Sequence, residues 1–264
     1  MNTTSFSQLV AGVTAADDDR WRVTIPADWM QGRTTYGGLS AALCLQAVQQ
    51  QFPELPPLRA AQINFIGPAG GEIEIEVNVL RQGRSVTYIM ASATLDGQIA
   101  THAVFCFGAS RESRLDADYT IAPNVPNVDA AGPFFTAAGA PVFTQHFECK
   151  LASGGQPVTG SDQHEHHIWV RHKDTEATGI PAMLGIADMP PPAVLPMFSE
   201  PAPISSMTWS LNFLSDDFTV ADNWWLIRTA AENARHGYSS QDMQIWNEAG
   251  ELVISAQQSV AVFY

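Results

Sequence analysis

The sequence predicts an α+β protein of two similar halves, in each of which an antiparallel sheet curls around one central helix. The first observation is an internal repeat, since Gln62-Ile63-Asn64-Phe65-Ile66-Gly67 resembles Ser210-Leu211-Asn212-Phe213-Leu214-Ser215 about 150 residues later. The second is that Arg84 and Arg235 follow these segments at nearly the same offset, as do the turns at 96–97 and 249–250. The third is that each half contains one markedly apolar helical segment. Together they indicate a duplicated unit.

In the first half, residues Trp21–Ile25 alternate as a strand does, and Leu39–Val48 is a helix with apolar residues almost all round. A helix without a polar face must be wrapped by other elements, and the strands that follow are the available wrapper. Strict alternation in Glu72–Val79 indicates one sheet face toward water and the other toward the helix. The predicted strands of this sheet are Leu58–Ile66, Glu72–Leu80, Val86–Leu95 and Gln98–Phe107.

From Ala109 the alternation gives way to charged residues, Pro, Asn and Gly. We therefore place an N-terminal repeat at residues 1–110, a linker at 111–141 and a C-terminal repeat at 142–264. The second helix is predicted over Thr178–Asp188, before three consecutive prolines that a helix cannot accommodate. The predicted strands of this half are Phe143–Leu151, His167–His172, Ser206–Phe213, Trp224–Ala231, Tyr238–Asn247 and Glu251–Phe263.

Composition excludes several classes of function. The formal net charge of −14 would repel nucleic acid and anionic lipid. The 3 cysteines show no metal-binding spacing and indicate thiols in a reducing compartment, so that a cytoplasmic protein is expected. No stretch approaches the length of a membrane span. We expect no cofactor and no metal.

The order of these segments resembles the acyl-CoA thioesterase II family over most of the chain. Tyr36-Gly37-Gly38 opens the first helix, and Arg81-Gln82-Gly83-Arg84-Ser85 leads into a long strand. The other segments that carry the resemblance are Asn64–Pro68, Asp96–Ala100, Ala187–Pro191 and Gly250–Gln258. The resemblance implies a double hotdog, two helix-in-sheet units in one chain, and hydrolysis of a fatty acyl-CoA to free acid and CoA.

The resemblance further implies a water molecule held by an Asp, a Thr or Ser, and a Gln. Carried over, these roles fall on Asp188, on Ser206 with Thr208 as the competitor, and on Gln258. A slip of one residue onto Gln257 is the alternative for the amide, and it would point that amide to the other face of the sheet.

The two copies differ at these positions. Taking Gly97 and Gly250 as equivalent, the first copy has Val104 and Phe105 where the second has two glutamines, and its helix offers no carboxylate. We therefore expect one active site per chain, in the second copy. The first copy is expected to supply substrate-binding residues at Tyr36, Gly37 and Gly38, because the start of a helix leaves N–H groups free for a developing oxyanion. Simple steric room is the equal alternative for the two glycines.

An acidic chain that binds CoA needs local positive charge for the phosphates. The sequence offers four arginines of the first copy as candidates, although each is more often a solvated surface residue: Arg33, Arg59, Arg81 and Arg84.

Other readings of the sequence are less well supported. The histidine-rich run 163–172 lacks a metal-binding spacing, and we interpret it as an exposed, hydrated strand. A serine hydrolase would need a G-x-S-x-G elbow, which is absent from the sequence. An enoyl-thioester hydratase would resemble enzymes with a His five residues after the Asp, where this chain has Ala193. A non-catalytic module that binds acyl thioesters is the main alternative, and a homodimer or higher homo-oligomer is possible.

Overall fold

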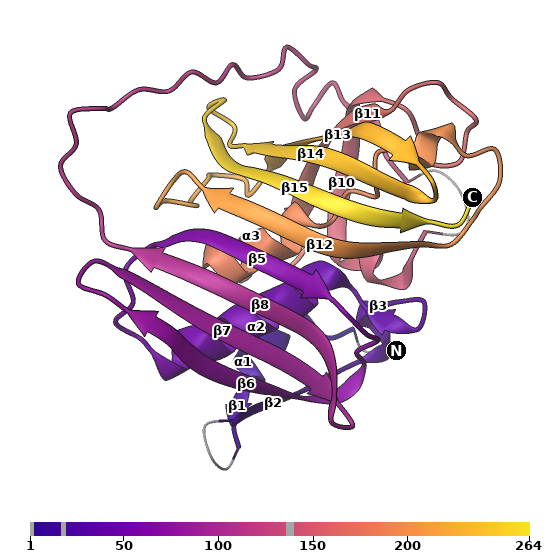
Figure 1. The fold of residues 1–264 in the computed structure, drawn as a ribbon. Coiled ribbons are helices and arrows are strands. Elements are labelled where there is room, and N and C mark those ends of the chain that lie inside the picture. Colours follow the sequence, from indigo (N-terminus) through magenta and orange to yellow (C-terminus); the bar gives the residue numbers. More distant parts are fainter. Residues whose placement is uncertain (1–2, 17–19, 136–139) are drawn as a thin grey trace.

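The computed structural model describes residues 3–16, 20–135 and 140–264, and its main feature is one long antiparallel sheet curled around two helices (Figure 1). Over these residues the sheet has 13 strands in the order β1-β2-β6-β7-β8-β5-β12-β15-β14-β13-β11-β10-β9. Strands of the first half occupy one side of this order and strands of the second half the other. The duplicated architecture predicted from the sequence is confirmed.

The first half follows the predicted order of elements. Helix α2 is apolar on all sides, and ten of its residues are buried between the sheet and the second central helix. A short first helix, which the sequence analysis did not predict, begins with Ser5 and Gln8 capping each other. The elements are α1 Phe6–Ala11, β1 Thr14–Ala15, β2 Arg20–Ile25, η1 Ala27–Trp29, β3 Met30–Gln31, β4 Thr34–Thr35, α2 Gly37–Gln51, β5 Leu58–Phe65, β6 Gly71–Gln82, β7 Val86–Leu95 and β8 Gln98–Gly108.

The second half repeats this plan with a shorter helix. Two boundaries were wrong by four residues. The strand predicted to end at Ala231 continues to Arg235. Residues 143–146 belong to a 3-10 helix that follows Pro141, with the Thr144 hydroxyl donating to the Pro141 carbonyl. The strand therefore begins only at Phe147. The elements are β9 Gly132–Pro133, η2 Val142–His146, β10 Phe147–Gly154, β11 Glu165–His172, α3 Gly179–Ala187, η3 Leu195–Met197, β12 Ile204–Phe213, β13 Trp225–Arg235, β14 Tyr238–Trp246 and β15 Leu252–Val262.

The two halves join through β5 and β12. These strands pair antiparallel, with Gln62 opposite Ser210 and Ile63 opposite Trp209. Each half would otherwise present an unpaired sheet edge at this position, and pairing satisfies the backbone groups of both edges. The two predicted sheets consequently form one continuous sheet, and α2 and α3 pack together beneath the junction (Figure 1).

The segment predicted as a linker runs across the outside of the second half before it enters the sheet (Figure 1). The Trp169 indole donates to the Pro126 carbonyl, and the Lys150 ammonium donates to the Val128 carbonyl. Residues 132–133 then pair with β10 at the edge of the sheet. The later part of this segment thus packs on the second half, and residues 136–139 lie outside the described residues.

The histidine-rich strand is buried, which corrects the expectation of an exposed, hydrated strand. β11 lies between β10 and β13, and His166 and His167 are 0% and 7% exposed. Burial lowers the pKa of His166 to about 3, so its ring is neutral. Within the described ranges, no cluster of three side chains could hold a metal ion, and no helix is long and apolar enough to cross a membrane.

Candidate active site

Asp188 lies where the end of one central helix meets the start of the other. It is the C-cap of α3, and its carboxylate lies against Gly37 and Gly38 in the first turn of α2, where the backbone N–H of Gly38 helps to lower its pKa. A carboxylate is unfavourable at the end of its own helix, but the positive end of α2 compensates for this. The side chain lies deep in the protein while part of its residue surface remains accessible. One half therefore supplies the acid and the other supplies its partner.

The two glycines at the start of α2 are required by this close approach. A β-carbon on Gly37 would lie 2.7 Å from Asp188 Oδ2 and 3.1 Å from the Phe65 ring. A β-carbon on Gly38 would lie 2.9 Å from the Leu184 carbonyl oxygen. Real β-carbons do not approach other atoms so closely, so steric room is one function of the pair.

Tyr36, predicted to bind substrate, is instead part of the packing between the helices. It is 1% exposed, its ring stacks on Phe143 with centroids 4.0 Å apart, and its hydroxyl donates to the Gly185 carbonyl at 2.5 Å. Because its hydroxyl already donates to a carbonyl of the protein and its ring is buried, Tyr36 is not available to a substrate in this structure. It ties the start of α2 to α3 and fixes the separation of Gly38 from Asp188.

Gln258 is the last of two hydrogen-bonded amides in a chain that ends on the Asp188 carboxylate. Its Nε2 donates to Asp188 Oδ1 at 2.9 Å, and its Oε1 accepts from Gln241 Nε2 at 2.9 Å. Gln241 Oε1 in turn accepts from the Ala193 backbone N–H at 3.0 Å. The Ala193 N–H can only donate, so the oxygen of Gln241 faces it and the Gln241 NH2 group faces Gln258. The oxygen of Gln258 then accepts from Gln241, which leaves the Gln258 NH2 group for Asp188. Gln258 must therefore present N–H to the carboxylate.

Gln241 was missed by the sequence analysis. It lies on β14 directly opposite Gln258 and is 0% exposed. A glutamine inside an alternating strand gives no signal of its own. Only its cross-strand pairing with Gln258, which requires the register of β14 against β15, could have identified it.

Ser206 reaches the inner face of the sheet because of an irregularity in β12. The register against β15 shifts between Ser206 and Thr208, which leaves Ser206 opposite Val260 and Thr208 opposite Ser259. The inward face includes Val260 and Gln258, both buried. A bulge of this kind turns a side chain to the other face of a strand. Ser206 thus shares the face of Gln258, and its hydroxyl has no hydrogen bond to any described side chain.

The alternatives from the sequence point the other way. Gln257 and Thr208 are exposed and line a groove on the outer face of the sheet. The structure therefore brings Asp188 and Gln258 into contact, places Ser206 on their face of the sheet, and separates Thr208 and Gln257 from them. Thr208 is not positioned to bind a substrate at Asp188, because its strand directs it to the opposite face.

Trp209 is the cross-strand partner of Gln258 on the inner face. It is 1% exposed, and among the described residues its indole N–H has no hydrogen-bond partner. A buried donor without a partner is rare in native structures. The unpaired donor belongs to the residue opposite Gln258.

Burial dominates the electrostatics of Asp188. It raises the pKa of the carboxyl from 3.8 to about 7, although hydrogen bonds from Gln258 and from Gly38 lower it. The Asp188 carboxyl can thus hold or release a proton near neutral pH, which is the property that a general base requires.

The corresponding place in the first half is apolar. Phe105, the counterpart of Gln258 when Gly97 and Gly250 are aligned, is 0% exposed, and the Ala41, Ala42 and Leu43 side chains of α2 are fully buried. Nothing in the described part of the first half repeats the carboxylate and amide of the second.

The four arginines proposed for CoA phosphates do not gather at this site. The Arg59 guanidinium pairs with Asp216 at 2.5 Å and also donates to Ser110. Arg33, Arg81 and Arg84 are exposed residues in or beside turns of the first half. Positive charge for a phosphate must therefore be sought elsewhere.

Two family models match the chain in succession. The acyl-CoA thioesterase N-terminal domain matches residues 25–108, and the acyl-CoA thioesterase C-terminal domain matches residues 122–262. None of the curated proteins matches the sequence.

Solved structures confirm the double hotdog. A hot dog fold protein of unknown function from Alicyclobacillus acidocaldarius is 24% identical, with 98% of both chains covered and a TM-score of 0.88. The tesB protein of Mycobacterium avium subs paratuberculosis is 16% identical, with 97% of this chain and 99% of that chain covered and a TM-score of 0.78. The acyl-CoA thioesterase II TesB2 of Mycobacterium marinum is 16% identical, with 97% and 98% covered and a TM-score of 0.72. At these identities the likeness shows the fold alone.

The raised pKa of Asp188 predicts a pH-dependent effect on stability. Because the folded pKa of about 7 exceeds the ordinary 3.8, the wild type loses stability as pH rises through this window. Asp188→Asn cannot ionise, so its free energy of unfolding relative to wild type should rise from about pH 5 to about pH 8. Urea unfolding measures this difference. Asp118→Asn is the control, because the pKa of Asp118 is lowered and its titration lies below the window. A difference that does not vary with pH would contradict the burial of Asp188.

Proposed function

Because this chain belongs to the acyl-CoA thioesterase family, we propose that it hydrolyses a fatty acyl-CoA to the free acid and CoA at Asp188. The observation that carries the proposal is the bond from Gln258 to a carboxyl whose pKa is raised to about 7, at the start of the helix of the other half. Perturbed groups of this kind gather at functional sites.

In the proposed reaction, Asp188 accepts a proton from a water molecule as the water oxygen attacks the acyl carbon. The C=O π bond opens, and negative charge develops on the former carbonyl oxygen. The carbonyl then re-forms, the C–S bond breaks, and the proton held by Asp188 passes to the departing sulfur. One water is consumed, and the acid and the CoA thiol are released with no change in oxidation state.

The other residues hold these reactants in place. Gln258 orients the ionised carboxylate through its N–H, and the Ser206 hydroxyl can bind the water on the same inner face. The indole N–H of Trp209 and the N–H groups at the start of α2 are the candidate donors to the developing oxyanion. The positive end of α2 stabilises negative charge both on the Asp188 carboxylate and on the developing oxyanion.

Loss of the base should abolish most of the turnover. Asp188→Asn is expected to lower kcat for acyl-CoA hydrolysis by about 10²–10⁴-fold, since general-base catalysis contributes about that factor. In the wild type, kcat should rise with pH through about 7, as Asp188 ionises. Release of CoA thiol from a series of acyl-CoA chain lengths measures both effects. Asp118→Asn in the exposed linker is the matched control.

Equal CoA release by wild type and Asp188→Asn would remove Asp188 from the mechanism. Absence of turnover in both, combined with protection of the fold by an acyl thioester, would favour the non-catalytic binding module.

The two faces of the sheet provide paired tests. Gln258→Ala and Ser206→Ala should lower kcat, by about 10²-fold or less each, because they remove groups on the inner face. Gln257→Ala and Thr208→Ala remove the neighbouring outward amide and hydroxyl and should leave kcat unchanged. Steady-state hydrolysis by the four variants is the measurement. If Gln257→Ala loses activity while Gln258→Ala keeps it, the register of β15 is wrong. The same outcome for Thr208→Ala and Ser206→Ala would mean that the register of β12 is wrong.

Gln241 acts through Gln258 and is a positioning residue. Gln241→Met removes the donor to Gln258 Oε1, which loosens the amide that holds the pKa of Asp188 down. We expect kcat to fall by about tenfold, the scale seen for groups that orient a ligand, with the midpoint of the pH profile shifted upward. The neighbouring outward Ser240→Ala is the control. A variant with lower stability but an unchanged midpoint would show that Gln241 only supports the fold.

A further inference from the structure

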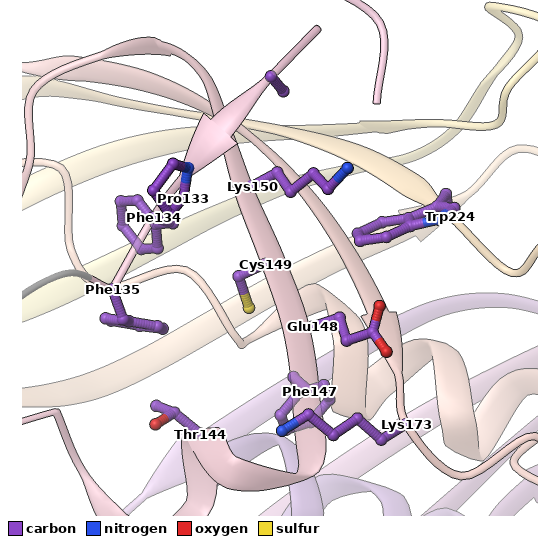
Figure 2. A pocket seen from close by; sticks show the side chains of 11 residues that line it. Pro133, Phe134, Phe135, Thr144, Phe147, Glu148, Cys149, Lys150, Lys173 and Trp224 are labelled. Carbon is purple, nitrogen blue, oxygen red and sulfur yellow. The ribbon is translucent and has the colours of Figure 1, made fainter. Parts of the chain in front are cut away.

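A cavity of about 570 Å³ opens at the edge strand β10 (Figure 2). Its volume lies in the range of small-molecule sites. Apolar side chains form much of its wall, and charged side chains lie beside them in Figure 2. The lining residues on which the argument rests are Phe134, Phe147, Glu148, Cys149, Lys150 and Lys173.

The cavity brings two positively charged side chains together. The sequence contains only two lysines, Lys150 and Lys173, and both line this cavity, although the chain carries a formal net charge of −14. The Lys150 ammonium donates to the Val128 carbonyl and lies 5.8 Å from the centroid of the Trp224 ring. Lys173 is exposed, and its ammonium makes no hydrogen bond or ion pair with a described residue.

The one acid in the wall does not cancel this charge. Glu148 accepts from the Arg171 guanidinium at 2.7 Å and is thereby neutralised. Arg171 itself lies over the Trp224 ring at 4.6 Å. Figure 2 shows Lys150 and Lys173 at opposite ends of the group, with Glu148 and Cys149 between them. The charges are thus spread along the cavity, as a ligand with several separated anionic groups would require.

The inner wall of the cavity touches both segments that flank the candidate active site. Cys149 Sγ lies 3.4 Å from the sulfur of Met189, the residue that follows Asp188. Phe147 packs edge-on against Tyr36, the residue that precedes Gly37, with ring centroids 5.9 Å apart. The cavity and the candidate active site thus lie on two sides of the same packed residues, Met189 and Tyr36.

Resting on the proposed function, we propose that this cavity binds the phosphorylated arm of CoA, with Lys173 as the principal phosphate ligand and Lys150 as the second. The CoA arm has a flexible, uncharged section next to sulfur and phosphates at its far end. The apolar side chains of the wall suit the uncharged section, and the two lysines suit the phosphates. An acyl tail has no charge for the lysines to bind, so it would lie elsewhere.

Calorimetric titration with free CoA tests the inference without any need for turnover. Lys173→Gln should raise the Kd by about fivefold at low salt, and the difference should shrink at high salt, as expected for an exposed ion pair. Lys150→Gln should have a smaller effect, because its ammonium is already bound to Val128. Arg235→Gln removes the same charge from an exposed strand end and should leave the Kd unchanged. Pantetheine, which lacks the phosphates, should bind wild type and Lys173→Gln equally.

An unchanged Kd in Lys173→Gln, an equal loss in Arg235→Gln, or no binding of CoA to the wild type would each overturn the inference. Hydrolysis of acyl-CoA with no dependence of CoA affinity on Lys173 would leave the proposed function standing and remove this site. Lys173-dependent binding of CoA without hydrolysis would do the reverse.

Discussion

The contact between the Asp188 carboxylate and the first turn of α2 is the constraint on which the arrangement of this protein depends. It brings the end of one central helix against the start of the other, so it exists only when both halves are folded and joined. The buried carboxylate would be costly by itself, because removal from water penalises its charged form. The Gly38 N–H, the positive end of α2 and the Gln258 amide offset that cost in part. The remaining penalty is what brings its pKa to about 7.

This constraint explains why the two copies have diverged. The second copy ends its helix after only 9 residues and places Asp188 there, whereas α2 continues for 15 residues with apolar side chains. The first copy contributes glycines and a tyrosine that position the helices, and the second contributes the acid and the amides. Joining β5 to β12 fixes the halves in one sheet, so that side chains from both can be held with the precision that a reaction needs.

The alternation of apolar residues was sufficient to predict the long strands, because each half hides one face of its sheet, but not the four strands of two residues, β1, β3, β4 and β9. The two central helices were predicted from their continuous apolar runs. The resemblance to the thioesterase family favoured Gln258 over Gln257, and the structure has Gln258 buried and Gln257 exposed. Parity alone did not decide between Ser206 and Thr208, since a bulge shifts the register between them. Such a shift depends on how neighbouring strands pair, which local sequence does not reveal.

Other features of the site depend on tertiary contacts and left no pattern in the sequence. Gln241 is informative only through its partner across the sheet, and the Tyr36 hydroxyl is used up by a carbonyl 149 residues away. The histidine-rich strand looked hydrated because its residues are polar, yet Phe134 packs beside His166 and the preceding segment covers Trp169. The lysines lie 23 positions apart in the sequence, counting from 150 to 173, and only the fold brings them to one cavity.

Direct titration of the Asp188 carboxyl tests the central claim most closely. In protein carrying ¹³C-labelled aspartate, the carboxyl resonance of Asp188, assigned by its loss in Asp188→Asn, can be followed by NMR as pH is varied. The structure predicts a midpoint near 7, because burial outweighs the two hydrogen bonds that the carboxylate accepts. A midpoint near the ordinary 3.8 would mean that the carboxylate is solvated, and the site described between the two helices would then be wrong.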